Sequence, residues 1–129
     1  MLSRLQQKLG LDSKIRATIL HAPSNYQEFL PPIQSFNKVN DLSVELEWIL
    51  AFYLDKQSLD KDISLLVNKL AKSGQLWLSW PKKSSALKTD LSDSLIRSAG
   101  LDSGLVDVKI VSINSTWSAL KFIYRLKDR

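Results

Sequence analysis

The run from Val44 to Leu54 constrains the fold more than any other segment. It opens with apolar and acidic residues in alternation and closes with six consecutive apolar residues, Ile49 to Leu54. Such a run is typical of a central strand buried on both faces of a sheet. A sheet of this kind is covered by helices on each side, so the run predicts a three-layer α/β domain.

The other patterns alternate between helix and strand, which favours a mostly parallel, Rossmann-like sheet in one domain over residues 1–129. Helices are expected at 2–9, 25–30, 58–72 and 89–99, and further strands at 15–22, 35–39, 75–80, 106–113 and 120–126. The connection between the last two strands is too short for a parallel crossover, so we expect them to be antiparallel.

Cap residues mark the ends of the two clearest helices. Ser58 is expected to begin one helix and Gly74 to follow its last turn. Thr89 is expected to begin the other and Gly100 to follow it. Serine and threonine accept hydrogen bonds from free amides at helix starts, and glycine readily adopts the left-handed conformation after a helix end.

Composition excludes several kinds of site. The chain has no cysteine and one histidine, so a thiolate or multi-histidine metal centre is not expected. Its longest apolar run, Trp48 to Leu54, is too short to span a membrane, and we expect a cytoplasmic protein. The net charge of +5 permits anionic partners. Basic and acidic residues are interleaved, however, so a solvated surface is favoured over nucleic-acid binding.

Candidate functional residues lie where the predicted strands end. The carboxyl ends of parallel strands meet at one edge of a sheet, which is where α/β proteins hold ligands. The segment from Trp80 to Lys83 ends one strand in a basic loop, and His21 ends another. The candidate ligand-contacting residues are Trp80, Lys82, Lys83, Thr89, Asp90, His21, Ser24, Asn25, Lys109 and Trp117.

The basic loop has a functional and a structural interpretation. Lys82 and Lys83 can bind a phosphate or carboxylate beside the amides of the next helix start. The structural alternative is a solvated loop. For Thr89 and Asp90 the simpler interpretation is a helix cap with an acidic first turn, and for Trp80 it is packing.

Three further candidates also have structural alternatives. Trp117 is expected in the turn between the last two strands, where it can stack on a ligand or, as we prefer, fold back onto the core. Lys109 can pair with Asp107 or Asp90, or serve a site near its strand. A lone His21, without an evident Asp partner or a nucleophile motif, is more often a hydrogen-bonded structural residue than a general base.

The predicted open sheet with a terminal antiparallel pair resembles the class I methyltransferase variant of the Rossmann fold. That resemblance implies a glycine-rich loop after the first strand, where the backbone approaches the cofactor. Here the first strand leads into His21-Ala22-Pro23-Ser24-Asn25, which contains no glycine. The scaffold therefore resembles a shortened methyltransferase that lacks the glycine-rich cofactor loop, and no cofactor is predicted.

Four sequence blocks resemble a small bacterial family of unknown function. They are Trp80-Pro81-Lys82-Lys83, Thr89-Asp90-Leu91, Gly104 to Lys109, and Thr116 to Phe122, in the family's order. The chain departs from that pattern at Ala119 and Ala86, where the family often has glycine. The resemblance supports the fold and implies no activity.

These observations favour a non-catalytic binding or regulatory module, with an anionic small molecule or a protein as partner. One alternative is an enzyme of unknown reaction that uses Lys82, Lys83, Asp90 and His21 in one concave pocket. A second alternative is weak nucleic-acid binding through the basic loop and the basic tail, Lys121 to Arg129.

Overall fold

The computed structural model describes residues 4–10, 16–28, 37–38 and 45–129, which form a central sheet with short helices on both faces. The strands are β1 (Arg16–Leu20), β2 (Asn37–Lys38), β3 (Leu46–Phe52), β4 (Leu70–Pro81), β5 (Leu105–Ser112) and β6 (Trp117–Tyr124). The helices are α1 (Arg4–Lys8), α2 (Lys56–Lys69) and α3 (Asp93–Asp102), with single 3-10 turns η1 (Tyr26–Glu28) and η3 (Leu126–Asp128).

The six strands lie in the order β2-β1-β3-β4-β6-β5. The strands β2, β1, β3 and β4 are parallel to one another, and β6 is antiparallel to both β4 and β5. The predicted α/β class and the antiparallel pair at the C-terminus are confirmed. The second strand of that pair, β6, is inserted between β4 and β5, so β5 shares the direction of the parallel strands.

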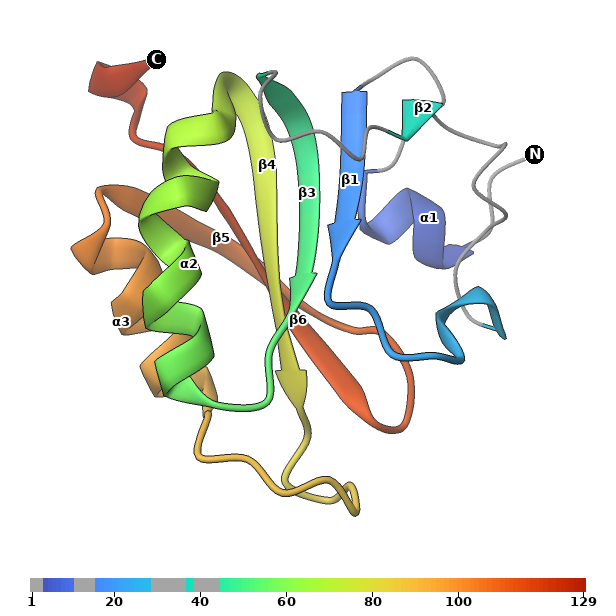
Figure 1. Cartoon of the computed structure of the whole chain (residues 1–129). Helices are drawn as coiled ribbons and strands as arrows, with labels where there is room; N and C mark the ends of the chain where they lie inside the picture. Colours follow the sequence, from blue (N-terminus) through green and yellow to red (C-terminus); the bar gives the residue numbers. More distant parts are fainter. Residues whose placement is uncertain (1–3, 11–15, 29–36, 39–44) are drawn as a thin grey trace.

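Helices α2 and α3 cover one face of the sheet, and α1 with η1 covers the other (Figure 1). Strand β3 contributes to the core on each side: Ile49 packs toward α2, whereas Trp48 and Leu50 pack toward α1. Every β3 residue except Glu47 is buried. The prediction of a central strand buried on both faces is therefore confirmed.

The first elements are shorter than predicted. Helix α1 covers five residues, and the indole nitrogen of Trp48 holds its end by donating a 2.8 Å hydrogen bond to the backbone oxygen of Leu9. The helix expected at 25–30 is represented by η1. Of the strand expected at 35–39, Asn37–Lys38 forms β2, and the rest lies outside the described residues.

The predicted limits of α2 were wrong at both ends. Its N-cap is Asp55, whose carboxylate accepts a 2.8 Å hydrogen bond from the backbone nitrogen of Ser58. At the other end the chain passes directly into β4, and Gly74 lies within that strand. A Cβ on Gly74 would lie 2.9 Å from a methyl carbon of Leu70, so the glycine permits close packing rather than ending the helix.

The limits of α3 also differ from the prediction. Its N-cap is Ser92, three residues after Thr89, and the side chain accepts from the backbone nitrogen of Leu95. Gly100 lies inside the helix, where a Cβ would lie 2.0 Å from the ring of Phe122. This glycine is therefore required for the contact between α3 and β6.

Strand β5 forms one edge of the described sheet, and its pairing with β6 is irregular between Asp107 and Lys109. The Arg97 guanidinium on α3 lies 3.0 Å from the carboxylate of Asp107. Lys109 pairs in register with Lys121 of β6. Among the described residues Lys109 forms no salt bridge with Asp107 or Asp90, the two partners considered for it, and the Asp107 carboxylate is bonded to Arg97 instead.

Candidate functional site

The strand order places a topological switch point between β1 and β3. From β1 the chain proceeds to β2 on one side and then returns to β3 on the other. The carboxyl ends of β1 and β3 lie together, with Leu20 in register with Ala51. Open α/β sheets bind ligands in the crevice outside such a point, because the connections on its two sides diverge there.

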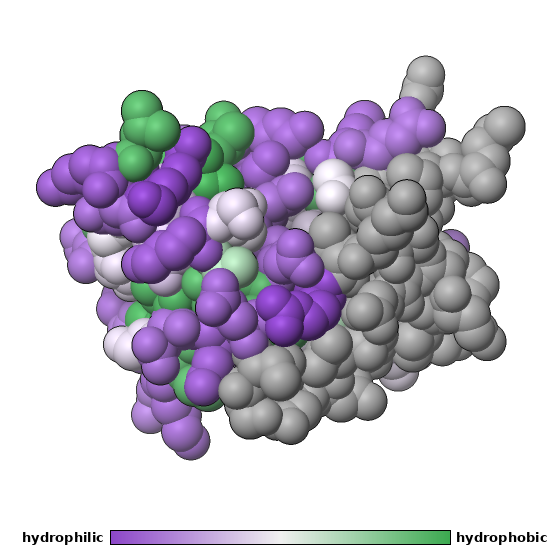
Figure 2. Space-filling view, turned by 90° about the horizontal axis from the view of Figure 1, so that it is seen from above, coloured by the Kyte–Doolittle hydropathy of each residue, from purple (hydrophilic) through white to green (hydrophobic). Residues whose placement is uncertain are grey.

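A cleft of about 620 Å³ lies at this switch point, and we call it the switch-point pocket. Its volume is within the range of roughly 300 to 1,000 Å³ that is usual for small-molecule sites. It is lined by His21, Ala22, Pro23, Phe52, Tyr53, Leu54, Asp55, Ser58, Lys61, Asp62, Leu87 and Trp117. The opposite end of the molecule, viewed in Figure 2, is mostly hydrophilic over its described part.

His21 follows β1 directly and has a left-handed backbone conformation, with φ 55°. This region is costly for a residue with a Cβ, and such residues concentrate at functional sites. The ring nitrogen Nε2 of His21 lies 2.9 Å from Oδ2 of Asp62, and the ring lies against Tyr53 with 5.4 Å between centroids. The imidazole therefore connects the end of β1 to α2.

Tyr53 follows the last residue of β3 and is 2% exposed. Its hydroxyl donates to Oδ2 of Asp62 at 2.8 Å, and its backbone nitrogen donates to the Ser79 oxygen of β4. Burial raises the pKa of the Tyr53 phenol well above its usual range, and the nearby Asp62 carboxylate raises this pKa further. Tyr53 is therefore a fixed hydrogen-bond donor at neutral pH.

Two carboxylates satisfy amides at the N-terminus of α2. Asp55 accepts from Ser58, and these hydrogen bonds lower the pKa of the Asp55 carboxyl. Oδ1 of Asp90 accepts from the backbone nitrogen of Lys56 at 2.9 Å. Free amides at a helix start attract anions. Here acidic side chains already occupy that position.

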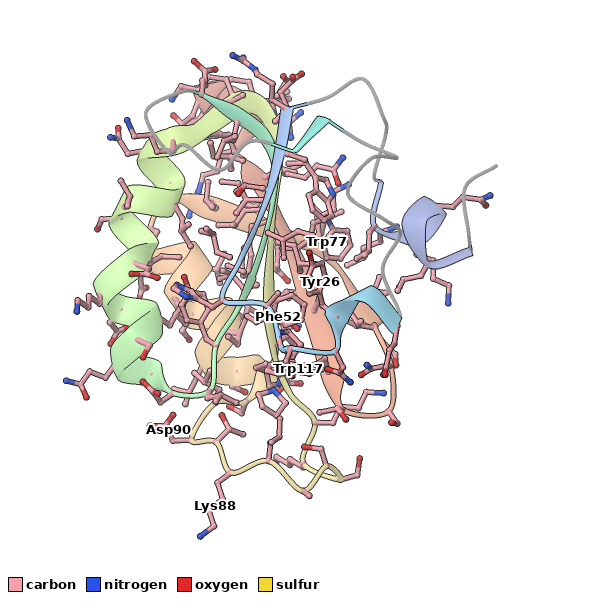
Figure 3. All side chains as sticks on the ribbon, turned by 45° about the vertical axis from the view of Figure 1, so that its right-hand side comes forward. Tyr26, Phe52, Trp77, Lys88, Asp90 and Trp117 are labelled. Atoms are coloured by element: carbon pink, nitrogen blue, oxygen red, sulfur yellow. The ribbon has the colours of Figure 1, made fainter. Side chains whose placement is uncertain are left out.

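The opposite wall of the pocket is apolar. The rings of Phe52 and Trp117 meet edge to face, with 5.0 Å between centroids and 88° between planes (Figure 3). Leu54 and Leu87 also line the pocket and are 46% and 43% exposed. Trp117 was predicted to lie in the turn before the last strand, but it is the first residue of β6. It is buried, which matches the preferred interpretation that it folds onto the core.

A second hollow of about 460 Å³ lies under the loop after β4, and we call it the basic hollow. It is lined by Lys82, Lys83, Leu87, Lys88, Thr89, Asp90, Leu91 and Ser92. Leu87 also lines the switch-point pocket. The Lys82 ammonium donates to the Ser112 hydroxyl at 2.6 Å, and the Lys88 side chain extends away from Phe52 and Trp117 (Figure 3).

The structure divides the predicted site residues into three groups. His21 and Trp117 line the switch-point pocket, whereas Lys82, Lys83, Thr89 and Asp90 line the basic hollow. The remaining candidates line neither cavity: Trp80 is buried in the core beside α2, Lys109 is on the edge strand, and Ser24 and Asn25 precede η1. The four residues of the enzyme hypothesis therefore do not share one pocket.

Two of these residues have specific structural roles. The Thr89 hydroxyl accepts from the backbone nitrogen of Leu91 at 3.0 Å and so stabilises a turn rather than a helix start. Asp90 holds the loop against α2 through Lys56. The expected helix cap at Thr89 and Asp90 was thus wrong, since Ser92 caps the helix.

Sequence reasoning missed the residues that α2 contributes. Ser58 and Asp62 line the pocket from the first two turns of α2, together with its N-cap Asp55. The spacings of three and four residues put these side chains on one face of the helix. That polar spacing beside a buried strand end was the available signal.

Metal-ligand groups and membrane-spanning helices are both absent from the described residues. Over these ranges, no group of three or more His, Asp or Glu side chains is arranged to hold a metal ion. Within the same part of the chain, no helix is long and apolar enough to cross a membrane.

Comparison with known proteins relates this fold to methyltransferases. No protein-family model and no curated protein matches the sequence. Among solved structures, magnesium protoporphyrin IX methyltransferase (ChlM) from Synechocystis PCC 6803 with bound SAH matches with a TM-score of 0.60 and 11% identity, over 93% of this chain and 78% of that one. A TehB-like SAM-dependent methyltransferase from Corynebacterium glutamicum matches with a TM-score of 0.56 and 11% identity, over 95% and 86%.

A third match is the Methanococcus jannaschii fibrillarin pre-rRNA processing protein, with a TM-score of 0.57 and 10% identity, over 96% of this chain and 70% of that one. Identities this low show the fold alone. The chain thus has a Rossmann-like, methyltransferase-like scaffold, as its element order predicted. The resemblance of its four sequence blocks to a bacterial family stays a prediction.

The turn after β1 does not fit the glycine-rich cofactor turn expected of methyltransferases. In a glycine turn the absence of side chains lets the backbone approach the ligand. Here the left-handed position is occupied by His21, whose ring is bonded to Asp62, and Ala22 and Pro23 follow it along the pocket wall. Side chains, not bare backbone, form this wall.

Proposed function

We propose that the protein is a non-catalytic binding module that holds a small molecule in the switch-point pocket of a methyltransferase-like scaffold. The observation that carries the proposal is the coincidence of the cleft of about 620 Å³ with the crevice between the carboxyl ends of β1 and β3. Side chains from four separate segments converge there, as they do in small-molecule sites.

The lining supports binding rather than catalysis. Both polar atoms that face the Asp62 carboxylate, from His21 and Tyr53, are already bonded to it. Tyr53 is held protonated by burial. Both side chains are thereby fixed as a polar surface that faces the apolar wall.

The direct test is binding of an uncharged fluorescent probe, N-phenyl-1-naphthylamine, to the purified protein. Ser58 is exposed and lines the pocket, so Ser58→Trp fills the cleft without disturbing the core. Gln57→Trp is the matched control, because Gln57 is also exposed on the first turn of α2 and does not line the pocket. We expect saturable probe fluorescence in the wild type and in Gln57→Trp, and its loss in Ser58→Trp.

Calorimetric titration with S-adenosylmethionine tests the non-catalytic part of the proposal. The turn at His21 has side chains where a glycine turn presents backbone, so we expect no heat of specific binding. Tight binding of S-adenosylmethionine would contradict the proposal and favour a methyltransferase. Equal probe binding by both tryptophan variants would instead show that the probe lies elsewhere.

The anionic ligand predicted from Lys82 and Lys83 would bind in the basic hollow and not in the switch-point pocket. These lysines line the basic hollow, next to the switch-point pocket at Leu87, rather than the pocket itself. An anionic group of a ligand would therefore lie at the loop and not against α2. This role of Lys82 and Lys83 stays a prediction.

A further inference from the structure

The switch-point pocket has two chemically unlike walls. One wall is apolar and includes the edge-to-face pair Phe52 and Trp117. The other wall belongs to the first turns of α2 and carries Asp55, Lys61 and Asp62. A ligand that fills the cleft must therefore present an apolar part to one side and a polar group to the other.

The charge of the polar wall is acidic. It holds two carboxylates, Asp55 and Asp62, and one ammonium, on the exposed side chain of Lys61. Asp90, whose carboxylate accepts from the Lys56 amide, lines the basic hollow with Lys82, Lys83 and Lys88 and is not part of this wall. The helix start cannot offset this charge, since both acidic caps already occupy its amides.

Asp62 is the best placed of these groups to contact a ligand. Its side chain is 29% exposed, so it is partly shielded from water and still accessible to a ligand. His21 and Tyr53 both bond to Oδ2, and among the described residues no hydrogen-bond donor reaches Oδ1. Two fixed donors hold the carboxylate in one orientation, which leaves a preorganised acceptor beside the apolar wall.

We infer that the pocket recognises an aromatic amine, with the ring against the apolar wall that includes the exposed side chains of Leu54 and Leu87, and the protonated amine donating to Asp62. A partly buried carboxylate favours a cationic donor and disfavours an anion. The apolar wall, where Leu54 and Leu87 are exposed, adds a surface on which a flat ring packs. This inference rests on the proposed binding function of the same pocket.

Three indole compounds of similar size and different charge test the inference. Tryptamine is cationic, tryptophol is neutral and indole-3-propionate is anionic at pH 7. Dissociation constants can be measured by NMR titration of the labelled protein. We expect tryptamine to bind about tenfold more tightly than tryptophol, with indole-3-propionate the weakest.

Variants of the acidic wall identify the group responsible. Asp62→Asn keeps an acceptor for His21 and Tyr53 but removes the charge, so we expect most of the preference for tryptamine over tryptophol to be lost, with Asp55 retaining the rest. Asp60→Asn is the control, because Asp60 is on the same helix and pairs with Lys56 outside the pocket. If Asp62→Asn does not fold, Asp55→Asn is the second variant. It retains the N-cap because asparagine caps as well as aspartate, and it should weaken the preference.

Each remaining outcome decides the question. Equal affinity of all three indoles for the wild type, or a preference for tryptamine that is undiminished in Asp62→Asn, would overturn the inference. So would tightest binding of indole-3-propionate, which would favour the anionic ligand predicted from Lys82 and Lys83. If the indoles fail to bind while N-phenyl-1-naphthylamine still binds and Ser58→Trp abolishes that binding, the amine inference fails and the proposed function stands.

Discussion

The hydroxyl of Tyr53 and the carboxylate of Asp62 lie 2.8 Å apart, which joins the end of the central strand β3 to the second turn of α2. The phenol is almost fully buried, and its carboxylate partner also bonds to His21. This pair forms the polar corner of the switch-point pocket. It also makes the stability of the protein depend on pH.

The unfolding free energy should fall as the pH rises above about 10, the usual pKa of tyrosine. Burial raises the Tyr53 pKa in the folded state, so above that pH the unfolded chain loses a proton that the folded chain retains. The slope is at most about 1.4 kcal/mol per pH unit for this one group. Urea unfolding between pH 8 and 11 measures it. Tyr53→Phe should reduce the slope, and Tyr26→Phe should retain it.

Removing the indole N–H of Trp48 should release α1. Trp48→Phe deletes the 2.8 Å hydrogen bond to Leu9 and leaves a buried carbonyl without that donor, at a cost of about 1 to 3 kcal/mol. Hydrogen exchange should accelerate in α1. Trp77→Phe is the control, since Trp77 is equally buried but its indole bonds to Gln75 within its own strand. Protection of α1 that is equal in both variants would contradict this anchoring role.

Gly100→Ala should destabilise the fold strongly. The added methyl would lie 2.0 Å from the Phe122 ring, so α3 or β6 must shift. Overpacking of this kind costs about 1 to 3 kcal/mol. Thermal unfolding gives the loss, with Ser98→Ala as the comparison on the exposed side of α3. A Gly100→Ala variant as stable as Ser98→Ala would show that the contact relaxes at no cost.

Asp90→Ala should destabilise the start of α2 and release the loop after β4 from it. It removes the acceptor for the Lys56 amide, a capping interaction worth about 1 kcal/mol. Asp90→Asn keeps an oxygen acceptor and should lose less stability. Chemical denaturation compares the two variants. If they lose the same amount, the interaction is electrostatic rather than a specific hydrogen bond.

The sequence predicted the fold class well because the buried strand signal is unambiguous. Val44 to Leu54 could be placed in the sheet centre from its apolar run alone, and β3 is there. Glycines were harder to interpret. Gly74 and Gly100 look like helix ends in sequence, but each lies inside an element where a neighbouring side chain leaves no room for a Cβ. Such packing depends on residues distant in the chain, which local patterns do not contain.

The larger cleft lies at the predicted edge of the sheet, the carboxyl ends of the parallel strands, and it is lined by two of the ten candidate residues. His21 and Trp117 were identified because they lie near predicted strand ends, and both line the pocket. The contribution of α2 to the pocket was missed, because Ser58 was interpreted only as the residue that begins the helix. Lys82 and Lys83 favoured a site at the loop after β4, but the switch-point pocket beside that loop is larger than the basic hollow.

The irregular edge strand β5 has a consequence for behaviour at high concentration. Val108 and Ile110 are 48% and 53% exposed there, and a regular strand with such residues would be a template for aggregation. The bulge beside Asp107 interrupts the row of hydrogen-bonding groups, and the charge of Lys109 must be desolvated before another strand can add. If β5 lost this bulge and became a regular edge strand, strands of other molecules could add to it and the sheet would extend from one molecule to the next.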